Sequence, residues 1–188
     1  MLTQTRHRIA ALFAAVSGVL LPSVGVCADA EVPVPRVQQV DLQRYAGAWF
    51  IIGSIPLSLE KGAHNPVETY TPEEDGSIKT VFQFRKDAFD GELETKNTVA
   101  TVVPQSNNAE WEVKLFWVIK GQYVISHLEQ DYSAAIIARD KRDHVWILSR
   151  TPTLSDARMA DYRERIIKMG YDFSKFEVFP QNGRKPQG

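Results

Sequence analysis

Apolar and polar side chains alternate along most of the chain, in short runs separated by turn residues. In the segment 77–86, for example, Ile78, Phe82 and Phe84 are spaced at intervals of two or four residues, with Lys79, Gln83 and Arg85 between them. Successive side chains of a strand point to opposite faces of a sheet, so this period of two predicts half-buried β-strands. Eight such segments occur: 48–55, 67–71, 77–86, 92–103, 111–118, 121–128, 132–139 and 144–150. Their short spacing predicts an all-β antiparallel sandwich or barrel.

A helical period appears once, near the C-terminus. Ser155 is a good N-cap, Gly170 is a good terminator, and the apolar positions between them follow a helical spacing. These positions are Met159, Tyr162, Ile166 and Met169. The segment predicts an amphipathic helix that lies against a sheet. A short last strand is expected at 176–180, and one helical turn capped by Asp41 is expected just before the first strand.

The N-terminus has a different composition. Arg6 and Arg8 precede an apolar run at 9–21, and small residues follow. This order predicts a secretory signal peptide, with cleavage after Ala28 or, as a second choice, after Ala30. The alternative is an uncleaved membrane anchor, for which the apolar run is short.

The chain therefore divides into four parts. We expect a signal peptide at 1–28, an extended leader at 29–40, a single β domain at 41–180 and a C-terminal tail at 181–188. The leader holds two prolines of the "EVPVPRVQQV" segment and shows no periodicity.

Cys27 is the only cysteine of the chain. It could carry the lipid of a bacterial lipoprotein, although Val26 before it is a poor match for the small residue that this signal prefers. Cleavage after Ala28 would instead leave a mature chain with neither a disulfide nor a thiol nucleophile. The sequence leaves both fates open.

Composition and charge narrow the function classes. The chain is 44% hydrophobic and 24% charged, as in ordinary globular proteins. A formal net charge of −1 argues against a nucleic-acid-binding protein, which would usually be basic. The sequence contains no Gly-x-Ser-x-Gly elbow, no His-Glu-x-x-His and no paired cysteines. We therefore expect a binding protein with no catalytic residues, metal or cofactor.

Three ordered motifs carry a family resemblance. "GAWF" resembles the Gly-x-Trp motif of the first lipocalin strand, and "EQDYSAAII" resembles the Asp-Tyr motif between the sixth and seventh strands. "WILSR" ends in an arginine, as the eighth lipocalin strand does, and "HVWILSRTPTLSD" is very similar to bacterial outer-membrane lipocalins related to apolipoprotein D. The resemblance covers about residues 41–180.

The resemblance implies an eight-stranded antiparallel up-and-down β-barrel, followed by the C-terminal α-helix and a short ninth strand. It implies that Trp49 plugs the closed end and that the guanidinium of Arg150 lies over its indole, a cation–π contact. Gly47 would leave room for the helical turn across the barrel floor. Asp131 and Tyr132 belong to the second structural motif.

The open end of such a barrel leads to a ligand cavity. Alternation and the resemblance together predict a mostly apolar and aromatic lining. Its predicted members are Ile51, Glu68, Tyr70, Thr80, Phe82, Val113, Leu115, Trp117, Tyr123, Ile125, His127, Ile136 and Trp146. The same alternation turns Val99 of the segment 92–103 inward. A slip of one residue would reverse the orientation of any strand. The loop 54–66, with Leu57 and Leu59, is expected to form a lid over the mouth.

Such a lining suits a long hydrocarbon chain, and the resemblance implies fatty acids or lysophospholipids as ligands, held for maintenance of the bacterial envelope. It also implies export to the periplasm, with outer-membrane attachment and a homodimer left open. Three alternatives remain. His127 or His144 could ligate the iron of a bound haem or hold another tetrapyrrole, Glu68 could act as the acid of a lipid-modifying enzyme, or the cavity could be incidental to a role in membrane structure.

Overall fold

The structure is a computed structural model that describes residues 32–115 and 119–184. The expected signal peptide, its cleavage site and Cys27 lie outside the described residues, as does Trp117. Leu115 is described as part of a strand, but the surroundings of its side chain are not.

Nine strands and two α-helices make up the described chain. Strands and helices follow in the order α1 Leu42–Tyr45, β1 Gly47–Ile55, η1 (a 3₁₀ turn) Ser58–Glu60, β2 Ala63–Pro72, β3 Ser77–Lys86, β4 Leu93–Val102, β5 Glu110–Leu115, β6 Ile119–Leu128, β7 Ala134–Ala138, β8 Val145–Ser149, α2 Asp156–Lys168, η2 Phe173–Lys175 and β9 Glu177–Val178. The predicted strands, the capped turn and the helix are therefore present.

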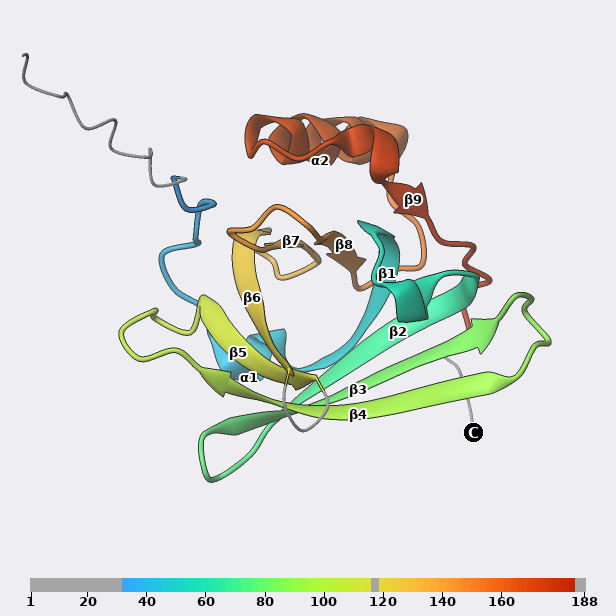
Figure 1. Cartoon of the computed structure of the whole chain (residues 1–188). Helices are drawn as coiled ribbons and strands as arrows, with labels where there is room; N and C mark the ends of the chain where they lie inside the picture. The colour runs from blue at the N-terminus through green and yellow to red at the C-terminus, as the bar shows by residue number, and fades with distance from the viewer. Residues whose placement is uncertain (1–31, 116–118, 185–188) are drawn as a thin grey trace, which may run out of the picture. The chain divides into compact units, whose positions relative to one another are not determined.

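The sheet closes into a barrel (Figure 1). Strands β2 to β8 pair antiparallel in sequence order, β8 pairs with β1, and β1 pairs back with β2. Strand β9 adds to the outside through Gly53 and Ser54 of β1. Because β1 pairs with both β2 and β8, the eight-stranded barrel has no open edge among its described strands, which confirms the predicted fold class.

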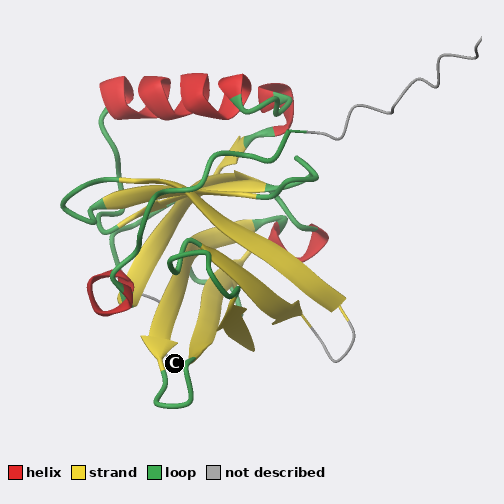
Figure 2. Ribbon diagram, turned by 90° about the vertical axis from the view of Figure 1, so that its left-hand side faces the viewer, coloured by secondary structure: helices red, strands yellow, loops and turns green. Residues whose placement is uncertain are grey.

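Helix α2 covers the outer face of β1 and β6–β8 (Figures 1 and 2). Ser155 caps the helix by accepting a hydrogen bond from the Arg158 amide, and Gly170 follows its end with φ +90°. Tyr162 and Ile166 are fully buried against outward-facing residues of the strands. The barrel wall therefore has two apolar layers on this side, one inside and one beneath the helix.

The leader is fastened to the barrel by a charged network. Arg36 contacts Glu110 at 2.9 Å and Asp140 at 2.8 Å, and the Val34 amide also donates to Asp140. These donors, Arg36 first, lower the pKa of Asp140 to about 2. Residues from Val34 onward thus lie along the wall.

The closed end of the barrel is built around Trp49. Its side chain is fully buried, its indole N–H donates to the Tyr45 carbonyl at 2.8 Å, and the Arg150 guanidinium carbon lies 3.7 Å from the ring centroid. Gly47 has φ +91°, and a Cβ there would lie 3.5 Å from Arg150 Nη1. A glycine is needed because a side chain in this backbone region would be strained.

Arg150 also holds the backbone of the helical turn. Its guanidinium donates to the carbonyls of Arg44, Tyr45, Ala46 and Ala48 at 2.9–3.0 Å. The carbonyls at the end of a short helix otherwise lack partners, so this one side chain joins the end of β8 to α1 and β1.

The second motif forms a turn at the same end of the barrel. Asp131 accepts from the Ser133 amide at 3.0 Å, and Tyr132 adopts φ +61°. The Tyr132 hydroxyl accepts from the Asp41 amide at 2.9 Å, and Arg44 lies 4.0 Å above its ring. Asp131 and Tyr132 therefore position the turn that carries α1.

Two predicted cavity residues point the other way. His127 packs against Tyr162 of α2, and Ile136 is buried in the layer beneath α2, so their predicted inward orientation is wrong. A bulge in β6 shifts the register between Ile125 and His127, and β7 is out of phase with the predicted alternation by one residue. Each such shift moves side chains from one face of the sheet to the other.

The predicted phase of β4 is also wrong. Ala100 is buried in the inner cluster, whereas Val99, which was expected to face inward, is 43% exposed. In β4 the inner positions are therefore the even-numbered ones, which places Lys96 opposite Phe82 on the inner face.

Replacing Trp49 should destabilise the whole barrel. Trp49→Ala removes a fully buried indole and the surface on which Arg150 rests, and large-to-small changes of this kind cost about 3–5 kcal/mol. The free energy of unfolding, measured by chemical denaturation, should fall by that amount. Ile167→Ala on the exposed face of α2 is the control and should change it by less than about 1 kcal/mol. An unchanged stability of Trp49→Ala would contradict this account of the closed end.

Candidate ligand-binding cavity

A cavity of about 420 Å³ occupies the interior of the barrel. This volume falls within the range of small-molecule sites in proteins. Its wall includes the residues Ile51, Leu57, Leu59, Glu60, Glu68, Phe82, Thr95, Lys96, Asn97, Thr98, Val113, Gly121, Gln122, Tyr123, Ile137, Arg139, Trp146 and Leu148. Apolar side chains from β1, β3, β5, β7 and β8 provide much of this surface.

Six of the predicted lining residues lie in this wall. They are Ile51, Glu68, Phe82, Val113, Tyr123 and Trp146. Tyr70, Thr80 and Ile125 are buried, and Tyr70 and Ile125 belong to the packed inner cluster rather than to the cavity surface. Of the four other predictions, His127 and Ile136 lie outside the barrel as described above, Trp117 lies outside the described residues, and the side chain of Leu115 is not described.

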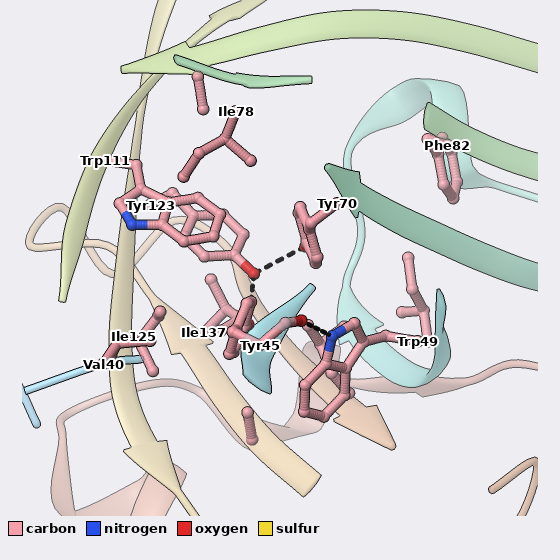
Figure 3. Close-up of a cluster of buried hydrophobic side chains, with 14 of the residues drawn as sticks. Val40, Tyr45, Trp49, Tyr70, Ile78, Phe82, Trp111, Tyr123, Ile125 and Ile137 are labelled. Carbon is pink, nitrogen blue, oxygen red and sulfur yellow. Dashed lines mark hydrogen bonds between the residues drawn. The ribbon is translucent and has the colours of Figure 1, made fainter. Parts of the chain in front are cut away.

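The floor of the cavity is a packed aromatic cluster (Figure 3). Trp111 stacks on Tyr123 with ring centroids 4.8 Å apart, and Tyr70 meets both rings edge-on. Tyr45 of α1 packs between Trp49 and Tyr70. These contacts close the lower end of the barrel and leave the cavity above them.

A chain of hydrogen bonds runs through this floor and ends at the cavity wall. The Tyr45 and Tyr123 hydroxyls are 2.8 Å apart, and the Tyr123 hydroxyl donates to that of Tyr70 at 2.7 Å (Figure 3). The Tyr70 hydroxyl in turn donates to Glu68 Oε2 at 2.6 Å. The chain satisfies three buried hydroxyls that would otherwise be costly to bury.

Glu68 is a carboxyl group enclosed by the barrel. Burial raises its pKa to about 7, and the Tyr70 hydrogen bond opposes this shift only in part. The side chain keeps a partly exposed surface, and Glu68 lines the cavity. Its protonation therefore changes the polarity of the cavity near neutral pH.

Glu60 is a second carboxyl in the cavity wall, and the sequence analysis did not identify it. Its Oε1 accepts from the Trp146 indole at 2.8 Å, and its Oε2 accepts from the Leu57 amide at 2.7 Å and from Ser54 Oγ at 3.5 Å. These bonds tie η1, in the expected lid loop, to β1 and β8. Burial raises the pKa of Glu60 to about 7.

The sequence of this loop indicates only part of the lid. Leu57 and Leu59 both line the cavity, as expected for the segment 54–66. The acidic residue beside them looks like an ordinary surface charge in the sequence. The Trp146 indole of β8 that donates to Glu60 is 86 positions away in the sequence, so no local pattern indicates this contact.

Among the described residues, two cationic side chains line the cavity, Lys96 and Arg139. Lys96 Nζ lies 2.7 Å from Glu94 Oε2, and Arg139 Nε lies 3.4 Å from Asp143 Oδ1. The prediction missed both because Lys96 depends on the phase of β4 and Arg139 on that of β7. Each cation has an acidic partner, so neither leaves the cavity strongly positive.

The histidines proposed for haem lie outside the cavity wall. His127 contacts Glu129 at 3.2 Å on the outside of the barrel, which contradicts its prediction as a ligand inside the barrel. His144 Nδ1 lies 3.1 Å from the Ile55 carbonyl. Within the described ranges, no three His, Cys, Asp or Glu side chains are grouped to hold a metal ion. None of the described helices has the length and hydropathy to cross a membrane.

The raised pKa of Glu68 predicts a pH-dependent stability. Its folded-state pKa of about 7 exceeds the ordinary 4.5, so its contribution to stability is complete below about pH 4.5 and is lost as the pH rises through about 7. Glu68→Gln stays neutral and still offers Tyr70 an acceptor. At pH 8 this variant should be more stable than the wild type by about 1–3 kcal/mol, and at pH 4.5 the two should be nearly equal.

Chemical denaturation at both pH values measures this difference. Glu74→Gln, in the exposed turn between β2 and β3, removes the same charge and should track the wild type at both pH values. A Glu68→Gln variant that is no more stable than the wild type at pH 8 would contradict this prediction. It would mean that the ionised carboxylate of Glu68 does not destabilise the folded protein.

Comparisons with known proteins agree with this architecture. A family model described as a lipocalin-like domain matches residues 40–181. The chain is 29% identical over 179 residues to the outer membrane lipoprotein Blc of Escherichia coli strain K12, covering 94% of this chain and 99% of that protein. It is 29% identical to temperature-induced lipocalin-1 of Arabidopsis thaliana, covering 80% and 84% of the two chains.

More distant relatives share the same fold. Apolipoprotein D of Bos taurus is 27% identical over 182 residues, covering 92% of this chain and 91% of that protein. The solved structure of insecticyanin from the tobacco hornworm Manduca sexta superposes with a TM-score of 0.62 at 18% identity, covering 81% of this chain and 87% of that one. The family match spans the barrel, the cavity and the closed end built on Trp49 and Arg150, and the chain belongs to the lipocalin family.

Proposed function

We propose that this protein binds a single-chain lipid in its barrel and stores or ferries that lipid in the bacterial envelope, with fatty acids and lysophospholipids as the ligand class. The observation that carries the proposal is the cavity of about 420 Å³, walled largely by apolar side chains above a packed aromatic floor. An enclosed apolar space of this size suits a hydrocarbon chain.

The hydrophobic effect would supply most of the affinity. Each buried CH₂ contributes about 0.8 kcal/mol, so a chain of about twelve carbons gains on the order of 10 kcal/mol before ordering costs. Leu57 and Leu59 of the lid add apolar contacts. The lid is held by Glu60, whose bonds to Trp146 and Leu57 would have to open for a ligand to pass beneath this loop.

The proposed location rests on the N-terminal sequence and on relatives. The order of charged, apolar and small residues in 1–28 is typical of an export signal. Relatives in Escherichia coli and Vibrio cholerae are named outer membrane lipoproteins. We therefore place this protein in the envelope, either free in the periplasm after cleavage or attached to the outer membrane through Cys27. The mass of the mature N-terminal peptide would distinguish a free protein from one attached through a lipid on Cys27.

Filling the cavity should abolish lipid binding. Val113 lies in the cavity wall opposite Gly121 of the neighbouring strand, so Val113→Trp places an indole where the ligand chain would lie. With the delipidated mature protein and an uncharged fluorescent acyl probe, the affinity should fall at least tenfold. Val99→Trp is the matched control, because Val99 is 43% exposed on β4, and its affinity should stay within about twofold of the wild type.

Thermal unfolding of both variants shows whether the barrel is intact. Unchanged probe affinity in a folded Val113→Trp would mean that lipids bind elsewhere and would contradict the proposal. Failure of the wild type to bind any acyl probe would contradict it more directly.

A further inference from the structure

The hydroxyl chain beneath the cavity has a fixed direction. An ionised Glu68 has no proton to give, so the Tyr70 hydroxyl must donate to it at 2.6 Å. The proton of Tyr70 is then used, so the Tyr123 hydroxyl donates to Tyr70, and by the same reasoning Tyr45 donates to Tyr123. All three hydroxyl protons point towards Glu68, and hydrogen bonds aligned in this way strengthen one another.

Glu68 is the acceptor at the end of this chain, and it has capacity left over. Among the described residues, hydrogen bonds engage only its Oε2, while the side chain lines the cavity. Glu60 differs, because both of its carboxylate oxygens already accept hydrogen bonds from other residues of the protein. The two carboxyls therefore have different roles: Glu60 fastens the lid, and Glu68 presents an acceptor to whatever enters.

Among the described residues, no cationic side chain forms an ion pair with Glu68, and the cations of the cavity wall, Lys96 and Arg139, contact Glu94 and Asp143 instead. Burial raises the pKa of Glu68, and the only opposing influence is the neutral Tyr70 hydroxyl. A carboxylate in such surroundings is stabilised by a positively charged donor and repels an anion. A terminal methyl group placed there would leave the charge desolvated and without a second partner.

We propose that Glu68 selects ligands whose buried end carries a protonated amine, so that the cavity prefers a long-chain alkylammonium to a carboxylate or an alcohol of the same length. This inference rests on the proposed role of the cavity as a lipid site and adds a condition on the polar end of the ligand. A fatty acid fits the same cavity with Glu68 protonated and its own carboxylate at the mouth, whereas an ionised Glu68 favours the amine. The ammonium supplies the donor and the charge that Glu68 lacks, and the alkyl chain lies against the apolar wall.

Other titratable groups around the site are accounted for. Glu60, Lys96, Tyr123 and Arg139 also line the cavity, and Tyr45 and Tyr70 continue the chain below it. Lys96 and Arg139 already face Glu94 and Asp143, respectively. The tyrosine pKa values are raised by burial, so these hydroxyls stay neutral in the experiment below.

The test compares three ligands of one chain length: dodecylamine, dodecan-1-ol and dodecanoic acid. Each displaces an uncharged fluorescent acyl probe from the delipidated mature protein, at pH 8.5 and at pH 5.5. At pH 8.5 Glu68 is ionised and the amine is protonated, so dodecylamine should bind at least tenfold more tightly than the other two ligands. At pH 5.5 Glu68 is neutral, and the advantage over dodecan-1-ol should shrink to less than about threefold.

Glu68→Gln should remove that advantage at pH 8.5 and leave the affinity for dodecan-1-ol within about twofold of the wild type. Glu74→Gln removes the same charge and is the matched control, so this variant should keep the advantage of dodecylamine. If Glu68→Gln does not fold, Glu60→Gln takes its place in the pH series, because the pKa values of Glu60 and Glu68 are both about 7. An advantage of dodecylamine that Glu60→Gln keeps at pH 8.5 belongs to Glu68, and one that it loses would overturn the inference. Binding of dodecan-1-ol without preference for the amine would overturn this inference and leave the lipid function standing, as would a preference for dodecanoic acid at pH 8.5. Binding of none of the three ligands or the probe would overturn both.

Discussion

The contact of Arg150 with Trp49 is the interaction on which the rest of this barrel depends. The guanidinium lies 3.7 Å from the indole ring and donates to four backbone carbonyls of α1 and β1. A planar cation with several donors can make both kinds of contact at once, which an ammonium cannot. The closed end is thereby fixed, and Tyr45, which packs against both Trp49 and Tyr70, joins it to the aromatic floor of the cavity.

That floor determines what the cavity can be. Tyr45, Tyr70 and Tyr123 fill the lower barrel with rings, but their hydroxyls need partners in a place that water does not reach. These hydroxyls bond to one another, and the last of them donates to Glu68, a carboxyl that faces the cavity. The cost is a desolvated acid whose pKa rises to about 7. Packing of the closed end and chemistry of the open cavity are thus two consequences of one arrangement.

The sequence predicted the architecture better than the cavity wall. Strand alternation, the capped helix at Ser155 and the Gly47, Trp49 and Arg150 motif all follow local rules or a family resemblance, and these features appear in the structure. The wall depends on the phase of each strand, which one extra residue reverses. The bulge before His127 moved that histidine outside, and the opposite phase of β4 brought Lys96 inside. Glu60 required a partner from a distant strand, which no local pattern reveals.

The central claim is that the barrel carries a single-chain lipid. Native mass spectrometry of the mature protein, extracted gently from its own cells, tests this most directly, because it weighs the processed chain together with its cargo. The account predicts an adduct with the mass of a single-chain lipid that collisional activation releases from the folded protein. A chain that carries no adduct, or one with the mass of a haem or another tetrapyrrole, would contradict the claim.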